Sequence, residues 1–178
     1  NLIRSFEQRP LLRPLMIFVG NVDAAASGLR ALPGEADFNR VWAGGDGAEA
    51  MIAAEVTAAA MAAEPFASID IHNNSGANPL YGCVNALAAE GLQLASLFSR
   101  ICVYYTNPST TQSVAFTRFC PAVTLECGQP GEAEGVARAT QFVLDVLHID
   151  YLDEARSTKR EMRIYYKVER IVVDKEIE

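Results

Sequence analysis

The sequence predicts an α/β protein, with a mixed sheet flanked by helices and a small β-rich module at the C-terminus. Three observations support this fold class. Short apolar runs with the length of strands recur along the chain, helical patterns separate them, and from Glu161 polar and apolar residues alternate. Strands separated by helices favour a sheet that is covered by helices on its faces.

Composition narrows the class of protein. A chain of 178 residues and 19.3 kDa fits about one domain with a sizeable core. The 15 Lys and Arg residues against 22 Asp and Glu give a net charge of −7, which argues against a nucleic-acid surface. No apolar run approaches the ~20 residues of a membrane span. The four cysteines lack CxxC spacing, so free thiols in a reducing cytoplasm are expected. Assembly into a homo-oligomer is left open.

The N-terminal part of the chain is expected to hold a helix, a strand and a long loop. Asn1 to Gln8 has helical spacing, which Pro10 and Pro14 interrupt. The continuous apolar run Leu15 to Val19 is typical of a strand covered on both faces. Gly20 to Arg40 is irregular, and a loop of that length is usually functional or disordered.

Three helices and three strands are predicted next. In the first helix Ile52 and Val56 share the face expected to be buried. Loops are expected over 73–81 and 107–119. The helices are predicted over 46–63, 85–100 and 132–147, and the strands over 66–71, 101–105 and 122–125.

The C-terminal tail has a different pattern. Residues 162–173 alternate polar and apolar with a period near two, as a half-solvated antiparallel strand does. We therefore divide the chain into an α/β domain over residues 1–152 and, over 153–178, a linker with the start of a β-rich module.

Two predicted strands end in residues that could carry chemistry. His72 follows the strand over 66–71, and a histidine beside polar residues at a strand end could bind zinc. Taken alone, a hydrogen-bonded structural histidine is the commoner case. Glu126 directly follows the strand predicted over 122–125 and stands two positions before Gly128. A partly buried carboxylate there could act as a base, or it could cap a helix or pair with an arginine.

Further candidates lie in the long loop and beside Glu126. Arg40 offers a planar fork that can hold a carboxylate, and the amide of Asn39 can add a hydrogen bond. A surface arginine without a role is the alternative. Cys127 adjoins Glu126, but neither of the two histidines is beside it in sequence, so a buried thiol is favoured over a nucleophile.

Four short motifs stand in an order that one known family shares. They are Arg30, Glu35-Ala36-Asp37-Phe38-Asn39-Arg40-Val41-Trp42, Asp70-Ile71-His72-Asn73 and Thr124-Leu125-Glu126-Cys127-Gly128. Together they resemble the succinylglutamate desuccinylase/aspartoacylase family of zinc amidohydrolases, within the zinc carboxypeptidase-like superfamily. The resemblance covers most of the chain, including the tail from Tyr165 to Val173.

The resemblance implies a role for each matching residue. His72 would be one of three zinc ligands, and Glu126 would activate the zinc-bound water and protonate the leaving amine. Asn39 and Arg40 would bind the substrate carboxylate, and Arg30 would polarise the scissile carbonyl. The spacing from Arg30 to Asn39 is longer than is usual for the family.

The chain has no HGxE-type motif, from which the family draws its other two zinc ligands. Because the chain opens within a helical pattern, without methionine, we expect that motif upstream of Asn1.

The implied function is a zinc-dependent hydrolase that cleaves an amide bond in a small N-acyl amino acid bearing a carboxylate. Two alternatives stay open. One is a carboxypeptidase-like peptidase that uses the same residues on a larger substrate. The other is a metal-free relative that binds a carboxylate ligand without catalysis.

Overall fold

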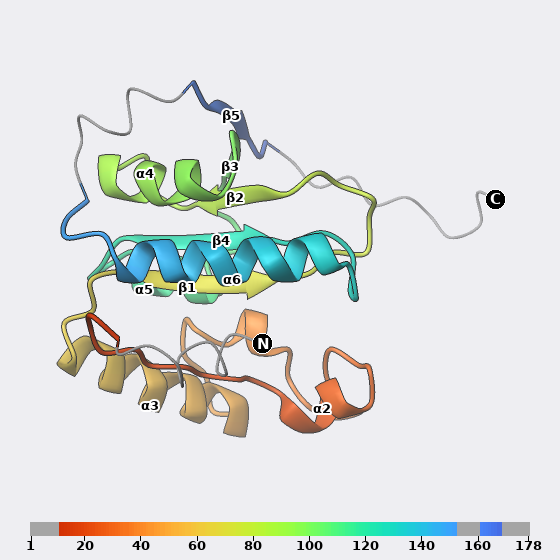
Figure 1. Cartoon of the computed structure of the whole chain (residues 1–178). Coiled ribbons are helices and arrows are strands. Elements are labelled where there is room, and N and C mark those ends of the chain that lie inside the picture. Colours follow the sequence, from red (N-terminus) through yellow and green to blue (C-terminus); the bar gives the residue numbers. More distant parts are fainter. Residues whose placement is uncertain (1–10, 153–160, 169–178) are drawn as a thin grey trace.

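A five-stranded mixed sheet forms the centre of the computed structural model, which describes residues 11–152 and 161–168 (Figure 1). Its strand order is β1-β4-β2-β3-β5, and the β2–β4 pair is antiparallel while the other neighbours are parallel. The predicted class, a mixed sheet flanked by helices, is confirmed. The strands are β1 (Ser68–His72), β2 (Tyr81–Val84), β3 (Ile101–Tyr104), β4 (Ala122–Glu126) and β5 (Arg163–Tyr166).

Helices α4 (Ala89–Phe98) and α6 (Ala133–Leu147) pack with one face of the sheet into the main hydrophobic core. The rings of Phe98 and Phe142 meet edge to face at 5.8 Å between centroids. Gly135 lets α6 begin directly against the end of β4, because a Cβ at Gly135 would lie only 1.9 Å from the carbonyl oxygen of Cys127. This close packing fixes the end of β4 that carries Glu126.

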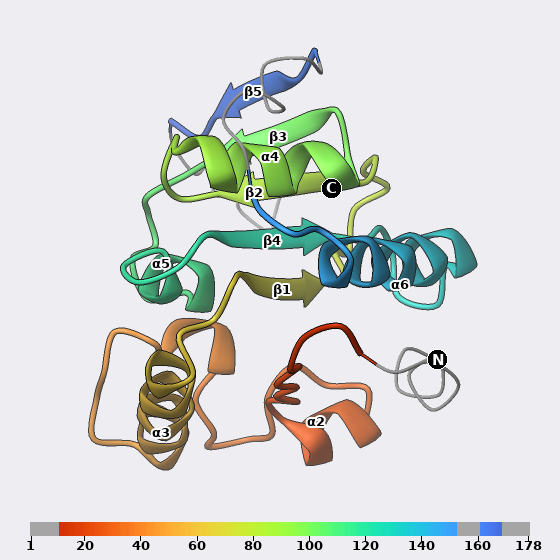
Figure 2. The same cartoon turned by 60° about the vertical axis from the view of Figure 1, so that its left-hand side comes forward.

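The opposite face is covered by α5 (Gln112–Phe116), which contacts β1 and β4. Beyond β1, at the edge of the sheet, lies a layer formed by the N-terminal segment, α2 (Val22–Ala26) and α3 (Ala48–Ala62) (Figure 2). A short 3₁₀ helix, η1 (Phe38–Arg40), precedes α3 and is capped by the side chain of Asp37.

Several predicted elements need correction. The run Leu15 to Val19 forms no strand, and Met16 and Val19 are 54% and 62% exposed. A strand needs a hydrogen-bonded neighbour, and within the described part of the chain this run has none. Helix α3 lies within the predicted range, and Val56 packs against the buried cluster around Ala60 as expected. Ile52, however, is 42% exposed, and the fully buried positions of the helix are Ala50, Ala53 and Ala60.

Two short elements, β2 and α5, occur where the sequence indicated loops or gave no assignment. Strand β5 pairs with β3 in parallel, whereas the alternation had favoured an antiparallel strand. It therefore extends the main sheet.

The predicted N-terminal helix over 1–8, the linker over 153–160 and the strand beyond 168 lie outside the described residues, and the domain boundary after residue 152 stays a prediction. In the described part of the chain no helix is both long and apolar enough to cross a membrane.

Candidate active site

The two strand ends singled out by the sequence meet in the folded chain. Strands β1 and β4 are parallel neighbours, and in their register His72 is the partner of Glu126. Tyr81, the first residue of β2, is the partner of Glu126 on the other side. Carboxyl ends of strands in open α/β sheets are the usual place for ligand sites. The structure thus brings together one imidazole and one carboxylate at such a place.

The imidazole of His72 lies between two carboxylates. Its Nε2 is 3.1 Å from Oδ2 of Asp70, and its Nδ1 is 3.6 Å from Oε1 of Glu126. Burial alone would lower the pKa of His72, but the contacts with Asp70 and then Glu126 outweigh burial and raise this pKa to about 10. Without a metal, the ring is therefore protonated at neutral pH, and a metal ion must displace a proton to bind it.

The loops that follow β1 and β4 are tied together around Glu126. The side-chain amide of Asn74 donates to Oε2 of Glu126 at 3.5 Å, and its backbone N–H donates to the carbonyl of Gly128 at 3.0 Å. The amide of Asn73 donates to the same carbonyl at 3.3 Å. Gly128 makes the turn possible with a positive φ of 76°. Both asparagines lie in the loop predicted over 73–81, and the loop pattern alone does not indicate the contact of Asn74 with Glu126.

Glu126 also influences buried groups near it. The pKa of Tyr81 is raised to about 12, first by burial and then by the charge of Glu126. Burial and Glu126 likewise raise the pKa of Cys127 to about 11, and this thiol is 3% exposed. A buried, protonated thiol is a poor nucleophile, which agrees with the structural role favoured for Cys127.

The other predicted site residues are Arg30, in the loop before η1, and Asn39 and Arg40, within η1. Arg30 forms an ion pair with Asp37, at 2.8 Å from its Nε to Oδ2, and it lines a cavity together with Asn39 and His72. The Oδ1 atom of Asn39 is buried without a hydrogen-bond partner. Arg40 is exposed, donates to the carbonyl of Asn39 and is not among the residues that line the cavity.

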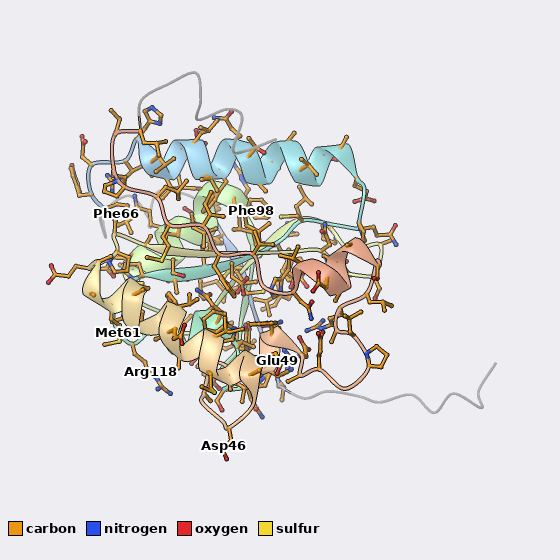
Figure 3. The ribbon with its side chains drawn as sticks, turned by 90° about the horizontal axis from the view of Figure 1, so that it is seen from below. Asp46, Glu49, Met61, Phe66, Phe98 and Arg118 are labelled. Atoms are coloured by element: carbon orange, nitrogen blue, oxygen red, sulfur yellow. The ribbon has the colours of Figure 1, made fainter. Side chains whose placement is uncertain are left out.

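This cavity separates β1 from the N-terminal segment. Its volume is about 1160 Å³, and the residues around it include Pro14 to Phe18, Trp42 and the whole of β1. Small-molecule sites usually measure roughly 300–1,000 Å³, so this cavity is somewhat larger than a usual small-molecule site. Phe66 lines the cavity where the chain passes from α3 to β1 (Figure 3). The guanidinium carbon of Arg13 lies 3.8 Å from the centroid of the Phe66 ring.

The described residues fit one ligand position of a zinc site. Within residues 11–152 and 161–168, no group of three or more His, Cys, Asp or Glu side chains could hold a metal ion by itself. His72, however, has the partner that a ligating histidine usually has, a carboxylate at one ring nitrogen, while its other nitrogen is beyond hydrogen-bond distance of Glu126. It is therefore suited to zinc binding as one ligand of a larger set.

No protein-family model and no curated protein matches the sequence. Solved structures do match. A succinylglutamate desuccinylase from Chromobacterium violaceum aligns with a TM-score of 0.65 and 19% identity, over 87% of this chain and 58% of that one. A succinylglutamate desuccinylase/aspartoacylase from Rhodobacter sphaeroides aligns with a TM-score of 0.57 and 24% identity, over 72% and 42% of the two chains. The chain has the fold of the succinylglutamate desuccinylase/aspartoacylase enzymes.

Murine aminoacylase 3 shares this desuccinylase-type fold, with a TM-score of 0.57 and 18% identity over 82% of this chain and 57% of that one. The resemblance that the sequence motifs indicated is thus confirmed at the level of the fold. The chain spans about half the length of these solved structures.

Proposed function

We propose that the protein is a zinc-dependent hydrolase that cleaves the amide bond of a small N-acyl amino acid. One observation carries this proposal: His72 and Glu126 are register partners at the ends of adjacent parallel strands, within a desuccinylase-type fold. An imidazole can bind a metal ion and a carboxylate can act as a general base, two functions that metal-assisted hydrolysis combines at one place.

Zinc would be held by His72 as one ligand of a larger set. When bound, it would polarise the scissile carbonyl and make the attacking water more acidic. In the folded chain, Nε2 of His72 contacts Asp70 and Nδ1 faces Glu126.

Glu126 would act as general base and then as general acid. It would accept a proton from water as the oxygen bonds to the carbonyl carbon, and return that proton to the amine as the C–N bond breaks. Asn74 holds Oε2 of Glu126, while Oε1 faces His72, so the carboxylate keeps one oxygen directed at the imidazole.

Arg30, Asn39 and Arg40 would bind the substrate. Arg30 and Asn39 line the same cavity as His72, which supports Arg30 as the group that polarises the carbonyl and Asn39 as a contact to the carboxylate. Arg30 would have to exchange its pairing with Asp37 for the substrate, and Arg40 would have to turn inward from its exposed position.

The size of the cavity favours one second candidate, a carboxypeptidase-like peptidase acting on a peptide. The two candidates separate in a hydrolysis assay on the zinc-loaded protein. N-acetyl and N-succinyl derivatives of acidic and aromatic amino acids are compared with short peptides that end in the same residues. The proposal expects chelator-sensitive hydrolysis of the acyl amino acids. Hydrolysis of the peptides alone would favour the peptidase, and binding of either class without turnover would favour a metal-free carboxylate-binding protein.

A further inference from the structure

We infer that the cavity beside His72 receives an extended hydrocarbon chain, so that the preferred substrate is an N-acyl amino acid with an unbranched, medium-length fatty acyl group. The inference rests on the proposed function, because His72 is one of the residues that line this cavity. It deepens that function by naming the acyl group, and it favours an apolar chain over a short acidic group such as succinyl.

One wall of the cavity is a row of aromatic side chains from distant parts of the sequence. The ring of Phe18 meets those of Phe38 and Trp42, with centroids 5.8 and 5.9 Å apart, and Trp42 meets Phe116 at 5.7 Å. All four rings line the cavity, and we call them the aromatic wall. Met16 also lines it and is 54% exposed. Apolar and aromatic surface of this kind is typical of sites that bind apolar ligand groups.

Strand β1 gives the length of the cavity from His72. Ser68, Asp70 and His72 all line it and occupy alternate positions of the strand, so their side chains leave β1 on one face. At the usual rise of a strand, the span from Ser68 to His72 is roughly 13 Å. No standard amino-acid side chain is that long. An acyl chain of several methylenes can therefore follow this wall, whereas the side chain of the amino acid cannot.

The charges around the cavity argue against an acidic acyl group. Of the described lysines and arginines, only Arg13 and Arg30 line it. Arg30 pairs with Asp37, and the proposed function assigns it to the scissile carbonyl. Arg13 donates to the carbonyl of Ile149, and its guanidinium carbon lies 3.8 Å from the centroid of the Phe66 ring. A carboxylate on the acyl chain would therefore lose its hydration without an unpaired cation to replace it.

Gln112 sets a limit to the length of the acyl chain. It lines the cavity near the start of β1, where its side-chain amide donates to Oγ of Ser68 at 2.7 Å. Its Oε1 atom is buried without a hydrogen-bond partner. A hydrocarbon chain that reached this oxygen would leave the acceptor unsatisfied, which is unfavourable. We therefore expect affinity to increase while the chain follows the aromatic wall and to stop increasing once it reaches Gln112.

The first test measures kcat/KM of the zinc-loaded, full-length protein on N-acyl derivatives of one amino acid, the one whose acetyl derivative is hydrolysed fastest. The acyl groups run from acetyl through hexanoyl and decanoyl to hexadecanoyl, with succinyl as the acidic comparison. Burial of one methylene favours binding roughly fourfold. The value of kcat/KM should therefore rise steeply from acetyl toward decanoyl and then level off or fall. Equal values for acetyl and decanoyl, or a preference for succinyl, would overturn the inference.

The second test measures the binding of decanoate to the metal-free, full-length protein by calorimetry, and so does not depend on turnover. Phe18→Asp and Met16→Asp place a charge on the cavity lining at positions 39% and 54% exposed, where the fold should tolerate it. Each should weaken decanoate binding by at least about tenfold. Val19→Asp is the matched control, because Val19 adjoins Phe18, is 62% exposed and is not among the residues that line the cavity. It should bind decanoate like the parent.

The two tests separate failure of the inference from failure of the proposed function. Decanoate that binds no more tightly than acetate, or that binds equally to the parent and to both lining variants, would overturn the inference and leave the proposed function standing. A parent that hydrolyses none of the acyl amino acids would overturn the proposed function and the substrate named here. Decanoate binding that both lining variants weaken would in that case still assign the cavity to a hydrocarbon chain.

Discussion

His72 and Glu126 are register partners on two parallel strands, and their side chains approach to 3.6 Å between Nδ1 and Oε1. The strands bring the two residues together from distant parts of the sequence. This relationship gives the proposed hydrolase its ligand and its base at the same edge of one sheet.

Replacing Glu126 by Gln should lower kcat by about 10²–10⁴-fold, because the amide cannot accept the proton of the attacking water. Zinc content should stay that of the parent, since Glu126 is not a ligand in the proposal. Glu134→Gln, at an exposed position of α6, is the matched control and should retain activity. Steady-state kinetics with metal analysis decides: a Glu126→Gln enzyme at full activity would remove Glu126 from the mechanism.

Replacing Arg40 by Ala should raise KM at least tenfold with a smaller effect on kcat. An exposed arginine that binds the substrate carboxylate contributes mainly to binding, and hydrogen bonds to charged groups are worth about 1.5–3 kcal/mol. Arg118, which is also exposed and points outward, supplies the control Arg118→Ala (Figure 3). If both variants keep the KM of the parent, Arg40 is a surface residue without a role in binding.

The stability of the metal-free protein should fall as the pH rises from about 6.5 to about 10. The pKa of His72 is raised to about 10 in the folded chain, so its contribution is complete below the unfolded pKa near 6.5 and is lost toward the folded one. Denaturant unfolding at a series of pH values measures this slope. The His72→Gln variant should show a smaller slope over that interval, and parallel profiles for the two proteins would contradict the assignment.

Replacing Gly135 by Ala should destabilise the fold by at least about 1–3 kcal/mol, because the added Cβ would overlap the carbonyl of Cys127 at the end of β4. Gly20→Ala is a suitable control, since a Cβ there would meet Phe38 at an ordinary 3.5 Å. Urea unfolding compares the two variants. Equal stability would mean that α6 can move away from β4 at little cost.

The sequence alone predicts the parts of this fold that local pattern determines. Strands β1 and β4 and helix α6 follow from apolar runs and helical periodicity. Strand β2 does not, because Tyr81-Gly82-Cys83-Val84 is no apolar run and Gly82 interrupts it. A glycine is needed there because α4 brings the backbone of Ala95 within 3.2 Å of a Cβ placed at that position. The run Leu15 to Val19 has the composition of a strand, but among residues 11–152 and 161–168 it pairs with no strand, and composition cannot reveal such a property of the tertiary structure.

In the candidate site, too, local pattern predicts some features and tertiary structure determines the others. His72 and Glu126 are predictable as polar residues that end apolar strands. The contact of Asp70 with His72 depends on the orientation of the imidazole ring, and the contact of Asn74 with Glu126 depends on the path of the loop after β1. Neither contact can be deduced from a sequence motif. The spacing Asp-x-His on a strand is nevertheless a usable signal for Asp70, since residues two apart share one face.

The most direct test of the zinc hydrolase is the metal content of the purified protein beside that of its His72→Ala variant. The proposal predicts about one zinc per chain in the full-length parent and much less in the variant, because His72 would be one of the three protein ligands that are typical of a catalytic zinc site. A parent protein without zinc, or a variant that keeps its zinc, would contradict it.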